Sequence, residues 1–363
     1  MDQVIKNVKV SLVESPVEYG FQDATRNVET VGMCVVQLTT DQGLTGIGTT
    51  YHEVGGPAIK ALIDEHFGPK IIGRSPFETE NIWEELFHYA RGVGRKGLSF
   101  CALSAMDIAL WDLKGKILGM PLYKLLGGTR KEVPIYASGG WTSLDDDALV
   151  EEALEMVRRG YKAIKLKVGF EGGKNLRGDV RRCAKIREAI GPDIDFMVDA
   201  NNAFHAGDAI KLANEIREYD IKFFEEPVFA DDLPGLRRFH QGTDIPLATG
   251  EHEYTRYGAR DLLINDATDY LQMDATRCGG YTEMLKCIAL SQAWNVAFAP
   301  HAMEHMHMHL VSAAPNAYAL ERLFLFEDIT RMVYDNPPEP HDGLLTIPDE
   351  PGLGLKLNKD FVK

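Results

Sequence analysis

The feature that most constrains the fold of this 363-residue chain is a series of eight short apolar runs that begins at Val133. Most runs start 20 to 30 residues after the previous one, with amphipathic helical stretches between them. Strand, helix and strand at this period predict parallel βα units, and eight such units predict a barrel. The runs are VPIYAS (133–138), AIKLKVG (163–169), IDFMVDAN (194–201), IKFFEEP (221–227), PLATGE (246–251), YLQMDA (270–275), VAFAPHA (296–302) and AYALE (317–321).

The N-terminal third has a different pattern. Strands are predicted at 4–14 and 31–50, and the turn at Asp41-Gln42-Gly43 indicates a hairpin. Helices are predicted near 55–67, 77–91 and 98–118. The last 29 residues are rich in Pro and Gly and are predicted to pack back on the N-terminal part.

The formal net charge of −15 excludes some partners. A nucleic acid backbone would be repelled, so nucleic acid binding is not expected. An anionic small substrate would need a local positive charge, either a metal ion or buried lysines. The five cysteines are odd in number and form no CxxC, which favours free thiols in a reducing cytoplasm. Neither a signal peptide nor a membrane span is expected.

Ionisable residues stand at the end of seven successive apolar runs. The catalytic groups of such barrels lie at the C-terminal ends of the strands. An unpaired buried charge costs several kcal/mol, so chance placement is a poor explanation. These residues are Lys165 with Lys167, Asp199, Glu225, Glu251, Asp274, His301 and Glu321.

Three carboxylates recur at a fixed interval, because 26 residues separate Asp199 from Glu225 and Glu225 from Glu251. One βα unit lies between each pair, so they arrive at equivalent positions on neighbouring strands. Three hard oxygen ligands that converge predict one Mg²⁺ site. The alternative is three independent salt-bridged or helix-capping acids.

Two acid/base candidates flank this site. Lys165 and Lys167 are two apart on a strand and point the same way; beside each other and a divalent cation, their pKa should be depressed. Asp274 and His301 end adjacent strands, and the Asp would fix the imidazole tautomer. The alternatives are solvated lysines and a packed histidine. Glu321 could stay neutral in so acidic a site and donate to a substrate carboxylate.

From the second run onward, the barrel runs contain, in order, KLK at 165–167, VDAN, EEP, GE at 250–251, Asp274, APH and Glu321. This ordered set resembles the mandelate racemase subgroup of the enolase superfamily. So do ALSAMDIALWDLKGK and PLYKLLGG in the N-terminal part. The resemblance implies an α/β fold, a modified (β/α)7β TIM-type barrel with an α+β capping domain. The expected division is 1–127 for the cap, 128–334 for the barrel and 335–363 for a segment that packs back on the cap.

The resemblance also implies roles. Mg²⁺ would be held by Asp199, Glu225 and Glu251, and the acid/base residues would be Lys167 and His301 with Asp274. Cap loops near 15–30 and 50–56 would close over the site. The substrate-binding candidates are Lys165, Glu321, Asn201, Tyr51 and His52. A homo-oligomer is expected.

The reaction that these roles imply is abstraction of the α-proton of a carboxylate substrate through an enediolate. The polar stretch at 252–256 resembles acid-sugar dehydratases more than the racemase. Dehydration of a sugar acid to a 2-keto-3-deoxy acid is therefore preferred. Cycloisomerisation of a sugar lactone or anhydro-sugar acid comes next, and racemisation or epimerisation last.

Three other functions compete. His301, His305 and His309 are four apart and could indicate a zinc hydrolase, but the first run carries no histidine. Residues 92–97 match GxGxxG, but a helical stretch precedes them where a dinucleotide site requires a strand. Outside enzymes, the chain could be an inactive sugar-acid binding protein.

Overall fold

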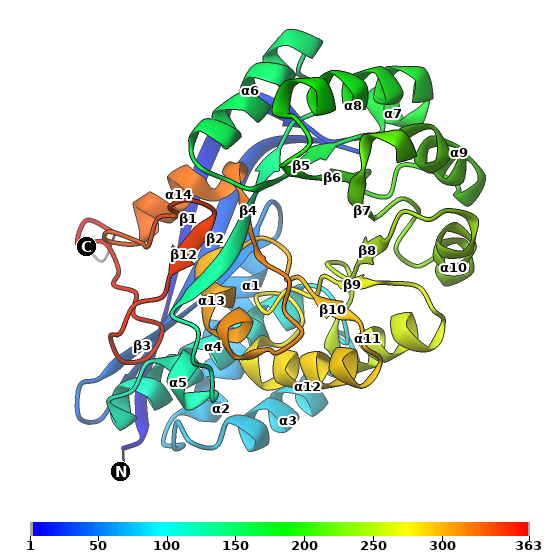
Figure 1. Ribbon diagram of the computed structural model, residues 1–363. Coiled ribbons are helices and arrows are strands. Elements are labelled where there is room, and N and C mark those ends of the chain that lie inside the picture. The colour runs from blue at the N-terminus through cyan, green and yellow to red at the C-terminus, as the bar shows by residue number, and fades with distance from the viewer. Residues whose placement is uncertain (1–2, 362–363) are drawn as a thin grey trace.

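The computed structural model describes residues 3–361, and among these no helix is long and apolar enough to cross a membrane. The N-terminal part forms an antiparallel sheet in the order β1-β2-β3, seen in blue in Figure 1. Its strands are β1 (Ile5–Gln22), β2 (Asn27–Thr40) and β3 (Thr45–His52). Thr39 pairs with Thr45 across the turn, so the predicted hairpin is confirmed.

The helix α4 (Leu98–Leu118) is buried against this sheet. Its contact with β3 requires glycine at two positions. A Cβ on Gly46 would lie 2.4 Å from the carbonyl oxygen of Ala109, and one on Gly48 would lie 2.0 Å from that of Ala105. The glycines therefore permit the helix backbone to lie directly on the strand.

The remaining cap helices lie around this pair. The predicted helix at 55–67 is broken into an α-helix and a π-helical turn, and the chain continues directly into a third short helix. Pro69 at the second position of that third helix lacks an N–H donor, which is tolerated at a helix start. These elements are α1 (Gly56–Leu62), η1 (Ile63–Phe67), α2 (Gly68–Ile71), α3 (Thr79–Ala90) and α5 (Leu122–Leu125).

The second part is a barrel of eight parallel strands in the order β4 to β11. The parallel bridge between Phe298 and Ala317 brings the last two strands together. The predicted α/β barrel fold is therefore confirmed. The strands are β4 (Glu132–Gly139), β5 (Ala163–Lys167), β6 (Asp195–Asp199), β7 (Ile221–Glu225), β8 (Leu247–Thr249), β9 (Tyr270–Leu271), β10 (Ala297–Phe298) and β11 (Leu320–Leu323).

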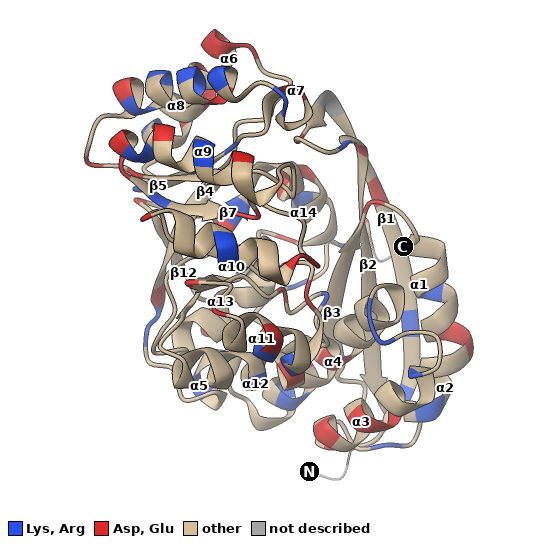
Figure 2. Cartoon of the chain, turned by 90° about the vertical axis from the view of Figure 1, so that its right-hand side faces the viewer, with Lys and Arg blue, Asp and Glu red and all other residues tan. Residues whose placement is uncertain are grey.

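Seven helices connect these strands and surround them (Figure 1). Figure 2 shows the charged residues mostly on the helices and loops, as expected for amphipathic helices that pack one face on a sheet. The connecting helices are α6 (Asp146–Arg158), α8 (Leu176–Ile190), α9 (Ala206–Ile216), α10 (Leu233–Gly242), α11 (Thr255–Ile264), α12 (Gly280–Ala293) and α13 (Glu304–Ala313). Shorter elements are α7 (Phe170–Gly173), η2 (Arg217–Tyr219), η3 (Phe324–Phe326) and α14 (Glu327–Val333).

The barrel interior contains a small apolar cluster that includes Met197 and Phe223. Side chains on a strand alternate between its two faces, so the residues two positions later also point inward. These residues are Asp199 and Glu225, both fully buried. The same alternation that fills the barrel with apolar side chains thus delivers two carboxylates to its mouth.

The C-terminal segment contacts both parts of the chain. The strand β12 (Leu344–Thr346) pairs antiparallel with the start of β4. Further on, the Leu353 N–H donates to Asp112 of α4 at 2.7 Å, and the Ile47 N–H of β3 donates to the same carboxylate at 2.7 Å. We propose that 335–363 completes the cap formed by 1–127, with the barrel at 128–334.

Candidate active site

A cavity of about 20 Å³ lies where the barrel strand ends meet the cap. It has room for about one water molecule. The barrel contributes Lys167, Asn201, Glu251 and His301 to its wall, and the cap contributes Tyr51. Five residues singled out in the sequence therefore lie together.

Two of the predicted metal ligands are paired with lysines. Asp199 Oδ2 lies 2.5 Å from Lys167 Nζ, and Glu225 Oε2 lies 2.6 Å from Lys165 Nζ. Glu225 also accepts from Gln272 Nε2 at 2.5 Å, but its Oε1 is buried without a hydrogen-bond partner. Burial raises the pKa of Glu225 well above its usual range, although Lys165 opposes this.

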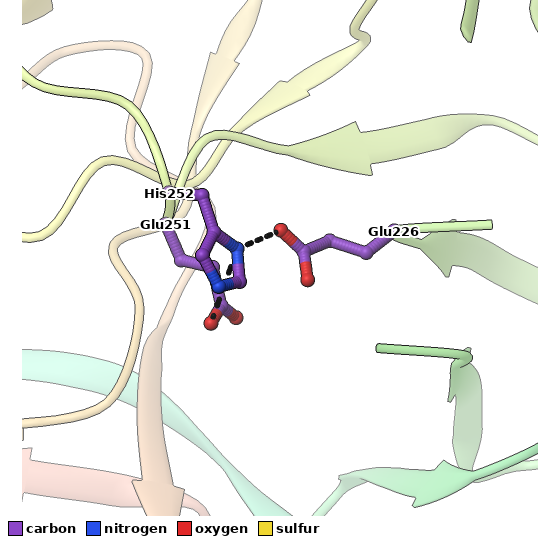
Figure 3. A group of neighbouring side chains, drawn as sticks. All are labelled: Glu226, Glu251 and His252. Carbon is purple, nitrogen blue, oxygen red and sulfur yellow. Dashed lines mark hydrogen bonds and ion pairs between the residues drawn. The ribbon is translucent and has the colours of Figure 1, made fainter. Parts of the chain in front are cut away.

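The third predicted ligand, Glu251, lies in a different group. The ligand atoms of Glu226, Glu251 and His252 all lie within 4.8 Å of one another (Figure 3). His252 Nδ1 is 2.6 Å from Glu226 Oε1 and 3.7 Å from Glu251 Oε1. The sequence analysis missed Glu226 and His252. Both are ionisable and directly follow Glu225 and Glu251, so their positions carried a usable signal.

The lysines differ from expectation, because their pKa values are raised rather than depressed. Burial lowers the pKa of Lys167, but Asp199 raises it more than Lys165 lowers it. Burial likewise lowers the pKa of Lys165, and Glu225 and Glu321 outweigh this effect. In this structure each lysine forms an ion pair with a buried carboxylate, at 2.6 Å for Lys165 and 2.5 Å for Lys167, which explains the sign of the shift.

His301 and Asp274 form the predicted pair. His301 Nδ1 is 3.1 Å from Asp274 Oδ2, and its Nε2 is 3.4 Å from Glu251 Oε2. Burial lowers the pKa of His301, but Glu251 and Asp274 raise it to about 9. Asp274 itself accepts from the N–H and the hydroxyl of Thr276 at 2.7 and 2.8 Å. The imidazole is thus held at one nitrogen and presents the other to the cavity.

The expectation that Glu321 stays neutral is wrong. Its Oε1 lies 2.7 Å from Lys165 Nζ, and its Oε2 accepts from the Ala302 N–H at 2.8 Å. Burial raises the pKa of Glu321, but Lys165 and His301 lower it to about 2. In this structure Glu321 is therefore the ion-pair partner of Lys165.

The two cap residues predicted to bind substrate, Tyr51 and His52, point to opposite faces of β3. Tyr51 lies in the cavity wall, 6.1 Å from His301 between ring centroids, and its hydroxyl accepts from Arg277 at 2.8 Å. His52 follows it on β3 and therefore points to the opposite face. Its ring fills the space beside Gly32 and Gly56 and is absent from the cavity wall.

The histidines of α13 are structural. His305 Nε2 bonds to the Pro338 carbonyl at 2.8 Å, and His309 bonds to the Tyr123 N–H and the Leu353 carbonyl at 3.1 and 3.0 Å. Over residues 3–361 they form no metal-ligand group with His301. The zinc alternative is therefore not supported by the geometry. The GxGxxG match at 92–97 lies in the loop between α3 and α4.

Comparison with known protein families gives two matches, one over the barrel part of the chain and one over the N-terminal part. Residues 148–361 match the family described as enolase C-terminal domain-like. Residues 6–127 match the N-terminal domain of mandelate racemase and muconate lactonizing enzyme. The fold and site thus define an enolase-superfamily enzyme. Within that class, the chain belongs to the mandelate racemase/muconate lactonizing enzyme family.

Its relatives act on sugar acids or their lactones. The chain is 35% identical to D-galactarolactone cycloisomerase of Agrobacterium fabrum, over 98% of this chain and 97% of that protein. It is 34% identical to L-rhamnonate dehydratase of Saccharopolyspora erythraea, over 94% and 87%. L-talarate/galactarate dehydratase of Salmonella typhimurium, solved with Mg and L-lyxarohydroxamate, is 31% identical, with a TM-score of 0.93 over 99% of this chain and 92% of that chain.

Proposed function

We propose that this chain removes the α-proton of a sugar-acid carboxylate, with Mg²⁺ held by Asp199, Glu225 and Glu251. One observation carries the proposal. Lys167 and His301 both line a single buried cavity, together with Glu251. Two proton-transfer groups and a carboxylate around one small space are what abstraction next to a carboxylate requires.

The residues at the site fit a magnesium ion. Three carboxylates supply the hard oxygen donors that Mg²⁺ prefers. The buried Glu225 Oε1 has no hydrogen-bond partner among the described residues, so an oxygen is available for a cation. When bound, the ion supplies positive charge that stabilises the negative charge developing on the substrate carboxylate. One Mg²⁺ per subunit is proposed.

The proton-transfer roles follow from the partners of each group. His301 is held through Nδ1 by Asp274, so its Nε2 is the atom that exchanges a proton with substrate. Lys167 Nζ lies in the same cavity wall and is the second acid/base. Which of the two takes the α-proton depends on the configuration of the substrate.

Dehydration is the preferred reaction. One base takes the C2 proton, the C3–O bond breaks as an acid protonates the departing hydroxyl, and the resulting enol tautomerises to a 2-keto-3-deoxy acid. The sugar-acid dehydratases among the relatives of this chain support this choice, since L-rhamnonate dehydratase is 34% identical to it. The proposed substrate is a small-molecule sugar acid. The chain is also expected to form a homo-oligomer, which light scattering would test.

A second candidate is cycloisomerisation, in which a ring C–O bond leaves in place of the hydroxyl. The 35% identity to D-galactarolactone cycloisomerase favours it. Both reactions begin with the same proton abstraction, so the residues named above serve either one. Racemisation, in which the opposite base returns the proton, is a third outcome.

The test is incubation with Mg²⁺ and a panel of sugar acids and lactones in D2O, followed by proton NMR. Loss of an α-proton signal with a 2-keto-3-deoxy product is expected. An open substrate identifies a dehydratase and a cyclic one a cycloisomerase, while an epimer alone identifies an epimerase. Absence of exchange with any acid, with unchanged binding by Lys167→Ala and His301→Ala, would favour a binding protein instead.

A further inference from the structure

A second chamber, of about 400 Å³, lies outside the small cavity. The side chains of Asp23, Arg26 and Asn201 line both spaces, so the two adjoin at these residues. A volume of 400 Å³ falls within the range of small-molecule sites. Given the proposed function, the end of the substrate remote from the reacting carboxylate would occupy this outer chamber.

The basic side chains of the outer chamber are already paired with acids. Arg26 Nε lies 3.1 Å from Asp23 Oδ2, and its NH1 is paired with Glu53. Lys96 Nζ lies 3.2 Å from Glu253 Oε2 and 4.0 Å from Asp231 Oδ1. Each cation therefore has two carboxylates beside it.

His252 is paired in the same way, because its Nδ1 lies 2.6 Å from Glu226 Oε1. The three basic residues of the chamber thus have six carboxylates beside them, of which Asp23 and Asp231 line the chamber itself. The six are Asp23, Glu53, Asp231, Glu253, Glu226 and Glu251. A second negative charge on the substrate would meet an excess of like charge, which opposes binding. The net charge of −15 acts in the same direction.

Neutral polar groups are available around the two spaces. Asn201, which lines both spaces, and Trp141, which lines the small cavity, are only 8% and 2% exposed. Asn201 Oδ1 and Trp141 Nε1 have no hydrogen-bond partner in the described part of the chain. One is an acceptor and the other a donor. A hydroxyl group can satisfy either, whereas a carboxylate can only accept. Unpaired buried groups of this kind cost free energy unless a ligand satisfies them.

We infer that this enzyme acts on sugar acids with a single carboxylate, whose neutral polyhydroxyl end occupies the outer chamber, in preference to diacids of the same configuration. The inference rests on the proposed function and narrows its substrate class. Neutral lactone rings belong to the accepted class because they add no second charge. The Asn201 amide, at the junction of the two spaces, and the Trp141 indole, in the wall of the small cavity, are the groups that recognise the substrate hydroxyls.

The test compares matched pairs of sugar acids that differ only at the remote carbon, a primary alcohol in one and a carboxylate in the other. Galactonate with galactarate and gluconate with glucarate are suitable pairs. Exchange of the α-proton in D2O and kcat/KM are measured for each. The monoacid of a productive pair is expected to exceed its diacid in kcat/KM by roughly tenfold or more.

Removal of one acid tests the cause of this preference. Asp231→Asn should raise kcat/KM for the diacid by roughly three- to tenfold and leave the monoacid within about twofold, because Lys96 then has one fewer carboxylate beside it. The matched control is Asp261→Asn, which removes the same charge from a neighbouring pocket that does not include Asn201. It should leave the ratio of the two substrates unchanged.

The outcomes separate the two proposals. Diacids that react as well as or better than their monoacids, with no effect of Asp231→Asn, would overturn the inference and leave the proposed function intact. If neither class exchanges its α-proton, the proposed function itself fails. Trp141→Phe supplies a further readout, because loss of the indole N–H should raise KM for the monoacid at least threefold.

Discussion

At the scale of single residues, the orientation of His301 depends on Asp274. Asp274→Asn keeps the shape but can donate its amide to His301 Nδ1, which would move the imidazole proton to Nε2. We expect a loss of about 10- to 100-fold in kcat, with KM little changed. Steady-state kinetics on the best substrate check this. A variant that keeps full activity would show that His301 does not transfer the proton.

A second residue-scale prediction concerns the choice of metal ligands. Glu225→Gln should weaken Mg²⁺ binding by about 10-fold or more, since it removes a negatively charged oxygen donor. Glu226→Gln changes the neighbouring acid in the same way and is the matched control. Calorimetric titration with Mg²⁺ measures both. A larger loss in Glu226→Gln would assign the ion to the group of Glu226, Glu251 and His252 instead.

At the scale of elements, the segment between β1 and β2 lines the site through Asp23 and Arg26. The Thr142 hydroxyl donates to the carbonyls of Gln22 and Asp23 at 2.9 and 3.0 Å, and the Phe21 ring lies 4.6 Å from that of Trp141. Thr142→Ala removes bonds worth about 1 kcal/mol. Trypsin cleavage after Arg26 should then accelerate by roughly two- to tenfold.

The matched control for this change is Thr39→Ala, which removes a threonine hydroxyl at the other end of the same sheet. It should leave cleavage after Arg26 unchanged. Equal cleavage of both variants and the wild-type protein would mean that the Thr142 bonds do not limit opening.

The element α13 makes the fold sensitive to acid. His309 Nδ1 accepts from the Tyr123 N–H, and Nε2 donates to the Leu353 carbonyl, so only the neutral ring satisfies both. Burial lowers the pKa of His309 to about 4. The contribution of neutral His309 to the free energy of unfolding is therefore present above about pH 6.5 and is lost as the pH falls towards 4. It is on the order of 3 kcal/mol at most.

The comparison variant is His309→Gln, whose amide can accept from Tyr123 and donate to Leu353 without titrating. Between pH 6.5 and 4 the Tm of the wild-type protein should fall by more than that of the variant. Parallel curves for the two proteins would contradict the assignment to His309.

At the scale of the whole molecule, Asp112 of α4 joins two distant segments through Ile47 and Leu353, and it also accepts from Lys116 of the same helix. Asp112→Ala would leave two buried N–H groups without an acceptor and would remove one of the two acceptors of Lys116. We expect a loss of about 3 kcal/mol in the free energy of unfolding. Urea denaturation measures it. A loss below about 1 kcal/mol would show that the segments are held by apolar packing alone.

Much of this architecture could be predicted from the sequence, for a physical reason. The barrel strands read as apolar runs because both faces are buried, and the rule of strand ends led to Lys167, Glu251 and His301 in one cavity. Arg26 and Trp141 could not be found this way. They come from loops, whose conformation depends on distant contacts such as that of Thr142 with Gln22.

The ionisation states of the site residues also could not be predicted from the sequence. Glu321 was expected to be neutral because the site is acidic, but its ionisation depends on a lysine 2.7 Å away. An ion pair at this distance depends on the three-dimensional structure and not on composition.

His52 was assigned to the site with Tyr51, although adjacent residues of a strand face opposite ways.

The bonds to Asp112 have a consequence for biosynthesis. Asp112 and the strand that contains Ile47 leave the ribosome early, but Leu353 follows Asp112 by 241 residues. All eight barrel strands lie between Asp112 and this partner in the sequence. The cap therefore reaches its final packing only after the last barrel strand has been synthesised.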